Sequence, residues 1–208
     1  EHLDQINEIK KMMEENSKFL SLSGLSGVFA GVIAIVGAWF AYNILTEFGI
    51  DPFAKQLSER IALKDLEVMT SKLIVVAIAV LCSAVIGGFI FTFIKGKREG
   101  AKLWTPSSRR LIINLAIPLF AGGMMAIAFL IHGISGFIAP LTLIFYGLAL
   151  LNASKYTLRD IRYLAICEVL LGIFGLFFIG YGFIFWIVGF GFLHILYGII
   201  MYVKYERK

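Results

Sequence analysis

Two ionisable residues lie inside long apolar runs, and they are the first candidates for chemistry in this 208-residue chain. Glu168 falls in the run 158–180, and His194 falls in the run 183–203. The turn between the two runs is centred near Tyr181 and Gly182, and the two residues are almost equally far from it. If the runs form an antiparallel pair of helices, Glu168 and His194 face each other about 10 to 15 Å from one membrane surface, given a rise of about 1.5 Å per residue.

Small residues accompany both ionisable residues at helical spacing. They are Gly172 and Gly175 beside Glu168, and Gly191 and Gly198 beside His194. Small residues next to an ionisable group are typical of a packed interior face rather than a lipid-facing one. A lone charged carboxylate at this depth costs roughly 2.5 to 3.5 kcal/mol, so we expect Glu168 to be protonated or paired with His194.

Two polar residues from preceding apolar runs complete the predicted buried polar site. Tyr146 and Asn114 lie in the runs 138–153 and 107–131, and either could reach Glu168 and His194. One interpretation is a proton-linked or substrate-binding site in a cavity of the bundle. The other is an interhelical hydrogen bond that locks the last two helices together. The residue types favour neither interpretation over the other.

An enzymatic site is not predicted. The chain carries no catalytic motif and no nucleotide-binding loop. Metal hydrolases need three or more converging His, Asp or Glu ligands, whereas the apolar runs offer one Glu and one His. We therefore expect no catalytic residue, no metal and no cofactor.

The elements that position these residues are apolar helices. Hydrophobic residues make up 59% of the chain and charged residues 16%, whereas a soluble domain of this size is usually about a quarter charged. The apolar runs are mostly close to the length of about 20 residues that crosses a bilayer. We predict an all-α membrane protein with six transmembrane helices in residues 19–208, after an amphipathic cytoplasmic helix in residues 1–18. The predicted spans are 19–45, 73–94, 107–131, 138–153, 158–180 and 183–203.

Capping residues mark several helix starts. Thr105 followed by Pro106 is typical of a cap and first turn, and predicts the start of the third span. Thr157 and Asp160 have capping-box spacing, which predicts the start of the fifth span. Asp51 followed by Pro52 predicts a short helix on the outer membrane surface within the loop 47–72.

The first span carries small residues at four-residue spacing, namely Ser23, Gly27 and Gly31. Such a stripe lets helix backbones approach closely in lipid. We interpret it as a helix contact inside the fold, and a homo-oligomer contact is the alternative. The helix predicted for residues 1–18 offers a second surface through which copies could pair.

Basic residues set the orientation. The stretch between the second and third spans carries six of them: Lys95, Lys97, Arg98, Lys102, Arg109 and Arg110. Loops rich in Lys and Arg stay in the cytoplasm, so we expect this stretch to fix topology beside the lipid headgroups rather than to bind nucleic acid. Both termini then lie in the cytoplasm, and the six spans form three hairpins that each run in, out and in.

Three segments carry a resemblance to a known family. They are SKFLSLSGLSG at 17–27, LALLNASKYT at 148–157, and the ending at 194–208. In these segments the chain resembles a family of uncharacterised multi-span integral membrane proteins of Bacteroidota. The resemblance implies a location in a bacterial inner membrane, and it brings no known activity or site residue.

Two functions follow from these patterns. The leading hypothesis is a non-enzymatic inner-membrane protein that binds a partner or ligand. The alternative is a small proton-linked transporter or channel that uses Glu168 and His194, which requires a water-accessible cavity at both residues.

Overall fold

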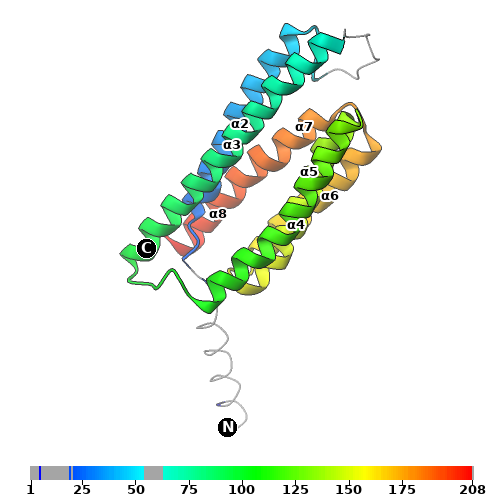
Figure 1. The fold of residues 1–208 in the computed structure, drawn as a ribbon. Coiled ribbons are helices and arrows are strands. Elements are labelled where there is room, and N and C mark those ends of the chain that lie inside the picture. Colours follow the sequence, from blue (N-terminus) through cyan, green and yellow to red (C-terminus); the bar gives the residue numbers. More distant parts are fainter. Residues whose placement is uncertain (1–4, 6–18, 20, 54–62, 208) are drawn as a thin grey trace.

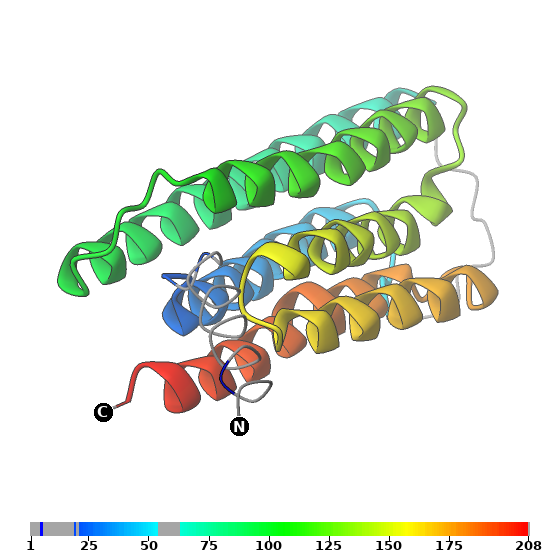
Figure 2. The ribbon, with the colours of Figure 1, turned by 90° about the horizontal axis from the view of Figure 1, so that it is seen from below.

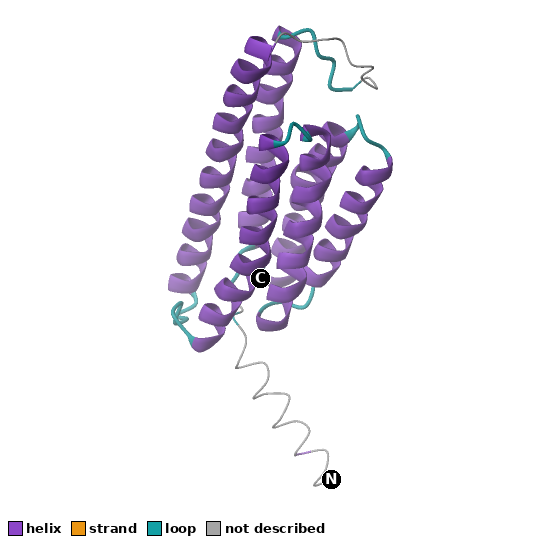
Figure 3. Ribbon diagram, turned by 45° about the vertical axis from the view of Figure 1, so that its right-hand side comes forward, coloured by secondary structure: helices purple, strands orange, loops and turns teal. Residues whose placement is uncertain are grey.

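The computed structural model describes residues 5, 19, 21–53 and 63–207, and all regular structure within them is helical (Figure 3). The α-helices are α2 (Gly24–Glu47), α3 (Leu63–Arg98), α4 (Pro106–Ile131), α5 (Ile138–Ala153), α6 (Ile161–Phe177), α7 (Gly182–Trp186) and α8 (His194–Tyr205). A π-helical segment, η3 (Ile187–Leu193), joins α7 to α8, and the 3₁₀ turns η1 (Ser135–Phe137) and η2 (Ser154–Tyr156) flank α5. The helix predicted for 1–18 and most of the predicted surface helix after Pro52 lie outside the described residues.

Five described segments are long and apolar enough to cross a membrane. They are α2, α3, α4, the segment Ser135–Tyr156 around α5, and the rod Gly182–Tyr205 formed by α7, η3 and α8. The remaining helix, α6, has 17 residues, which corresponds to about 26 Å at 1.5 Å per residue. The helices are those of a membrane-embedded protein.

The described helices form two layers (Figures 1 and 2). In one layer α2 packs between α3 and α8, and in the other α5 packs between α4 and α6. Glycines mark the contacts within the layers: a Cβ on Gly37 would meet Val80 of α3, and one on Gly147 would meet Val169 of α6. The layers contact each other chiefly along α7 and η3.

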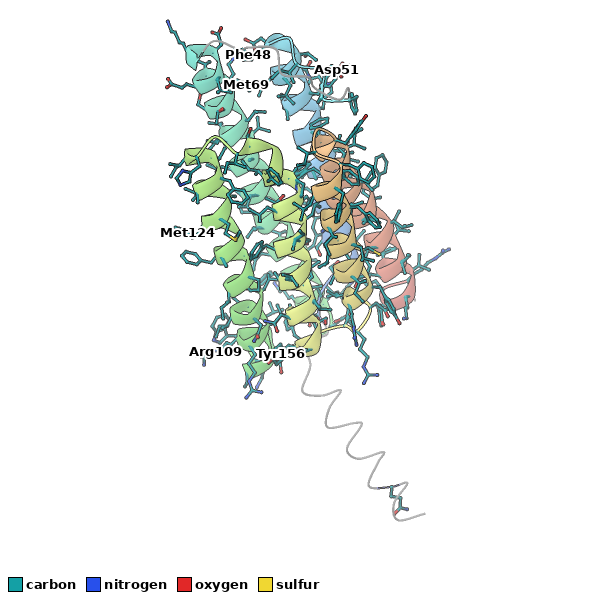
Figure 4. The ribbon with its side chains drawn as sticks, turned by 90° about the vertical axis from the view of Figure 1, so that its right-hand side faces the viewer. Phe48, Asp51, Met69, Arg109, Met124 and Tyr156 are labelled. Atoms are coloured by element: carbon teal, nitrogen blue, oxygen red, sulfur yellow. The ribbon has the colours of Figure 1, made fainter. Side chains whose placement is uncertain are left out.

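Loops gather at the two ends of the bundle. Figure 4 shows Arg109 and Tyr156 at one end, with Phe48 and Asp51 at the other. The backbone amide of Phe19 donates to the carbonyl oxygen of Tyr156 at 2.9 Å, so the entry to α2 lies at the first end. We call this end, which also holds the stretch between α3 and α4, the basic end.

One predicted helix start is confirmed and one is wrong. Thr105 caps α4: its side chain accepts from the backbone amide of Ser108, and the Ser108 hydroxyl accepts from the amide of Thr105. The predicted capping box of Thr157 and Asp160 does not form, because α6 begins at Ile161 without a side-chain cap. The Thr157 hydroxyl instead donates to the carbonyl oxygen of Phe19 at 2.7 Å.

The small-residue stripe of α2 packs against α8 and η3. A Cβ on Gly27 would lie 3.1 Å from the Gly198 Cα, and one on Gly24, which follows Ser23 and was not part of the predicted stripe, would lie 2.6 Å from the carbonyl oxygen of Gly198. A Cβ on Gly31 would lie 2.6 Å from the carbonyl oxygen of Gly191. The stripe therefore forms a helix contact inside the fold, as the first interpretation predicts.

Candidate functional site

Glu168 and His194 lie together where the two layers meet. Glu168 projects from α6 and is fully buried, and His194 is the first residue of α8 and is 5% exposed. The His194 Nδ1 atom lies 3.3 Å from the Glu168 Oε1 atom. The predicted pairing of the two side chains across the last two spans is thus present in the structure.

The hydrogen bonds of His194 fix its ring. Nδ1 lies 3.0 Å from the carbonyl oxygen of Gly189, and Nε2 lies 2.7 Å from the Tyr146 hydroxyl oxygen. A carbonyl oxygen only accepts, so Nδ1 carries the hydrogen that is donated to Gly189. In the neutral ring, Nε2 then accepts a hydrogen bond from the Tyr146 hydroxyl.

The π-helical segment supplies the partner for His194. Gly189 lies within η3, where the backbone departs from the regular α-helical ladder. Single π-helical turns inside α-helices occur frequently at functional sites. Here the segment places a carbonyl oxygen of the same rod against the imidazole ring, and this irregularity was not visible in the apolar pattern of the sequence.

Glu168 is the unsatisfied member of the site. Neither of its carboxylate oxygens, both buried, accepts or donates a hydrogen bond among the described residues. The 3.3 Å approach of His194 Nδ1 is an electrostatic contact, because the Nδ1 hydrogen is directed to Gly189. Buried polar atoms are nearly always hydrogen-bonded, so an orphaned carboxylate at this depth needs an explanation.

The structure brings Tyr146 into the site but not Asn114. The Asn114 side chain donates to the carbonyl oxygen of Arg110 at 2.8 Å, within its own helix. The Asn114 carbonyl oxygen accepts from the Asn152 side chain at 3.2 Å. Asn114 therefore contributes to a contact between α4 and α5 nearer the basic end.

The glycines predicted to accompany the site contact other helices. A Cβ on Gly172 would lie 2.8 Å from the carbonyl oxygen of Pro140, and one on Gly175 would lie 3.1 Å from the Pro140 Cγ, so both face α5. Gly191 and Gly198 face α2 instead. Each helix has two packed sides, and the small residues line the side of closest backbone approach. The glycine that does adjoin Glu168 is Gly189, which the sequence patterns did not single out.

A second, partly buried polar cluster lies at the basic end, and sequence reasoning missed it. The Glu206 carboxylate accepts hydrogen bonds from the Gly24 amide and from the Ser23 hydroxyl at the start of α2. Its Oε1 atom lies 3.6 Å from Lys95 Nζ, which also donates to the carbonyl oxygen of Leu22 at 2.8 Å. A negative charge at a helix N-terminus satisfies free amides and complements the helix dipole.

Lys95 therefore differs from the other basic residues of its stretch. Its side chain is 9% exposed and engaged with Glu206, whereas the stretch was expected to face the lipid headgroups. The remaining five residues are exposed at the basic end: Lys97, Arg98, Lys102, Arg109 and Arg110. They are placed where headgroups could reach them.

Within the described part of the chain, no group of three or more His, Cys, Asp or Glu side chains could hold a metal ion. Comparison of the chain with protein-family models, with curated proteins and with solved structures finds no match.

Proposed function

We propose that this chain is a non-enzymatic membrane protein whose ligand at the buried polar site is a proton, bound by Glu168. The observation that carries the proposal is the Glu168 side chain itself. It is fully buried between two layers of helices, and both of its oxygens are without a hydrogen-bond partner among the described residues. Intramembrane ionisable groups of this kind are commonly functional, because an unused one is costly to keep.

The space around Glu168 favours a proton over a larger ligand. A Cβ on Gly189 would lie only 2.6 Å from the Glu168 Oε2 atom and 2.4 Å from the Leu143 Cδ2 atom. Leu143 is fully buried beside it. Packing this close leaves the carboxylate room for a hydrogen on oxygen, whereas a substrate molecule would need the layers to separate.

The proposed location is a bacterial inner membrane, crossed six times as three hairpins with both termini in the cytoplasm. The five exposed Lys and Arg residues at the basic end support this orientation through the positive-inside rule. α6 serves as the sixth span in this proposal, since 17 residues is the lower limit for a helix that crosses the hydrocarbon core.

The proposed partner is the lipid bilayer, and nucleic acid is not proposed as one. A homo-oligomer formed through the small residues of the first span would have to displace α8, because Gly24, Gly27 and Gly31 already contact that rod. If copies of the chain pair, they therefore pair through a surface other than this one.

A proton-linked transporter is the second candidate, and the position of η3 favours it. The π-helical segment lies at the joint between the layers and also holds His194 through Gly189. Protonation of Glu168 could change the packing at that joint. The complete burial of Glu168 argues against an open channel.

Infrared spectroscopy of the full-length protein in lipid nanodiscs tests the proposed function. We expect a carboxylic acid C=O band that titrates with pH in the wild type and is absent in Glu168→Gln. Glu99→Gln is the matched control, because Glu99 is exposed at the basic end and should leave the band intact. A spectrum in which no buried carboxyl changes with pH, or in which Glu168→Gln retains the titrating band, would contradict the proposal. Proton flux in liposomes then separates the transporter from a protein that only binds the proton.

A further inference from the structure

The side of α8 that faces the other layer carries polar residues in a row. His194, Tyr197 and Tyr205 are separated by three and eight residues, so they share one side of the helix with Met201. Met201 is 2% exposed, which shows that this side is packed. The row runs from the Glu168 site to the basic end of the bundle.

The end of the row nearest the basic end is polar and reaches solvent. The Tyr205 hydroxyl donates to the Asp160 Oδ2 atom at 3.0 Å, and Lys204 Nζ donates to the same oxygen at 2.6 Å. The Lys204 side chain is 53% exposed and that of Asp160 is 19% exposed. Asp160 therefore connects solvent at this end to the side of α8 that carries the row.

The middle of the row holds the second residue of the region with an unsatisfied polar group. The Tyr197 hydroxyl oxygen is buried and has no hydrogen-bond partner among the described residues. Along α8 it lies three residues from His194, whose ring contacts the Tyr146 hydroxyl, and eight residues from Tyr205, whose hydroxyl contacts Asp160. A buried hydroxyl without a partner is costly, and a bridging water needs two to four polar groups of this kind around it.

We propose that Tyr197 is the middle station of a proton path that leads from Asp160 at the basic end to Glu168. The inference rests on the proposed function, because it supplies the route by which the bound proton reaches its site. The Tyr197 hydroxyl bridges, with bridging water, the hydrogen-bonded pair of Asp160 and Tyr205 to the hydrogen-bonded pair of Tyr146 and His194.

Each step of the path conserves protons. A proton from solvent enters at Asp160, and each hydroxyl along the row accepts one proton and releases its own to the next acceptor. Tyr146 passes a proton to His194 Nε2 across 2.7 Å. Nδ1 then gives up the hydrogen that it donates to the Gly189 carbonyl oxygen, and this hydrogen passes to Glu168 Oε1, 3.3 Å away. The proton ends on the carboxylate, while the tyrosines and His194 return to their starting charge. His194 also returns to its Nδ1–H form when its ring hydrogens rearrange.

The ionisable groups that face this path come from three segments of the chain. Tyr146 projects from α5, while Asp160 and Glu168 come from the start and middle of the α6 segment. The remaining members lie on α8, and they are His194, Tyr197, Lys204 and Tyr205. Between the Glu168 site and the basic end, the Tyr197 hydroxyl is the group of this path without a hydrogen-bond partner among the described residues, which makes it the sharpest point to test.

The experiment follows the Glu168 carboxyl band after a rapid pH jump, using the full-length protein in sealed vesicles of uniform orientation. Tyr197→Phe removes one oxygen atom and keeps the ring. We expect it to slow the response of the band at least about tenfold, a barrier increase of about 1.4 kcal/mol, with the equilibrium titration unchanged. Only a jump on the side of the basic end should give the fast response in the wild type.

Tyr163→Phe is the matched control, because Tyr163 lies on α6 and is 70% exposed. It should keep the wild-type rate, and Asp160→Asn should slow the response as Tyr197→Phe does. An unchanged rate in Tyr197→Phe, with Glu168 still titrating, would overturn the path and leave the proposed function standing. A Glu168 band that does not titrate in the wild type would overturn both. Thermal unfolding of Tyr197→Phe checks that a slower rate does not come from a loosened fold.

Discussion

The carboxylate of Glu168 occupies the space that a side chain at Gly189 would need. A Cβ built on Gly189 lies 2.6 Å from Glu168 Oε2 and 2.4 Å from the Leu143 Cδ2 atom, both much closer than van der Waals contact. The same glycine gives its carbonyl oxygen to His194 Nδ1 at 3.0 Å. Gly189 of the π-helical segment thus leaves space for the Glu168 carboxylate, and its carbonyl oxygen orients the His194 ring.

Gly189→Ala should disturb the site. The added methyl group must displace the carboxylate or Leu143, and overpacking of this kind typically costs about 1 to 3 kcal/mol of the free energy of unfolding. Denaturant titration of the detergent-solubilised protein measures the change. Gly123→Ala is the control, since a Cβ there meets nothing within 4 Å. Equal stability of Gly189→Ala and Gly123→Ala would show that the packing at Glu168 is looser than the structure indicates.

Glu168→Leu separates a functional carboxyl from a structural lock. The substitution removes two buried oxygens without hydrogen bonds, while His194 keeps Tyr146 and Gly189 as partners. Replacement of a buried polar group by an apolar one of similar size is often neutral or stabilising, so we expect unfolding free energy to stay the same or rise by about 1 kcal/mol. If the Glu168 carboxyl instead holds the last two helices together by an interhelical hydrogen bond, the substitution should lower the unfolding free energy by about 1 to 3 kcal/mol.

The sequence was informative where a pattern depends on local chemistry. The span 138–153 coincides with α5, and the Thr105 cap forms as its residue types predict. The juxtaposition of Glu168 and His194 was predictable, because residues equally far from the turn between two antiparallel helices lie side by side. The helix that each glycine contacts was not predictable, because it depends on how the two layers pack.

The misassigned cap and the missed cluster share one cause. Thr157 bonds to Phe19, 138 residues away, and Glu206 bonds to Gly24, 182 residues away. Side chains at helix ends satisfy whichever backbone groups the fold brings near, and helical spacing cannot report partners that distant. The burial of Lys95 was not predicted for the same reason, because its partner Glu206 lies far away in the sequence.

Glu206→Gln should weaken the joint between the C-terminal segment and the start of α2. The amide keeps a hydrogen-bond acceptor for Gly24 but loses the charge that faces Lys95, whose side chain is only 9% exposed. Hydrogen bonds to charged groups contribute about 1.5 to 3 kcal/mol, so we expect a loss of about 1 to 2 kcal/mol in unfolding free energy. Faster amide hydrogen exchange at the first turn of α2 is the local readout.

The exposed Glu99 provides the comparison for this substitution. Glu99→Gln changes the net charge equally and should leave both stability and exchange at α2 unchanged. If the two variants behave alike, the Glu206 contacts contribute nothing measurable, and the burial of Lys95 would need another source of stability.

Gly198→Ala tests the contact between α2 and α8 on which the first layer depends. A Cβ on Gly198 would lie 2.4 Å from the Val28 amide nitrogen and 2.7 Å from the Gly24 carbonyl oxygen. Backbone atoms cannot yield as a flexible side chain does, so the two helices must move apart along their length. We expect a loss of about 2 to 3 kcal/mol in unfolding free energy, at the upper end for overpacking.

Gly88→Ala supplies the reference for that loss, because Gly88 lies inside α3 with nothing within 4 Å of its Cβ position. Alanine is the better helix former by about 1 kcal/mol, so Gly88→Ala should be neutral or stabilising. Both substitutions gain the same helix propensity. A loss of unfolding free energy in Gly198→Ala alone therefore reports the close backbone approach of α2 and α8. A Gly198→Ala variant as stable as Gly88→Ala would mean that α2 and α8 are not in backbone contact, and the layer that holds His194 would then have to be assembled differently.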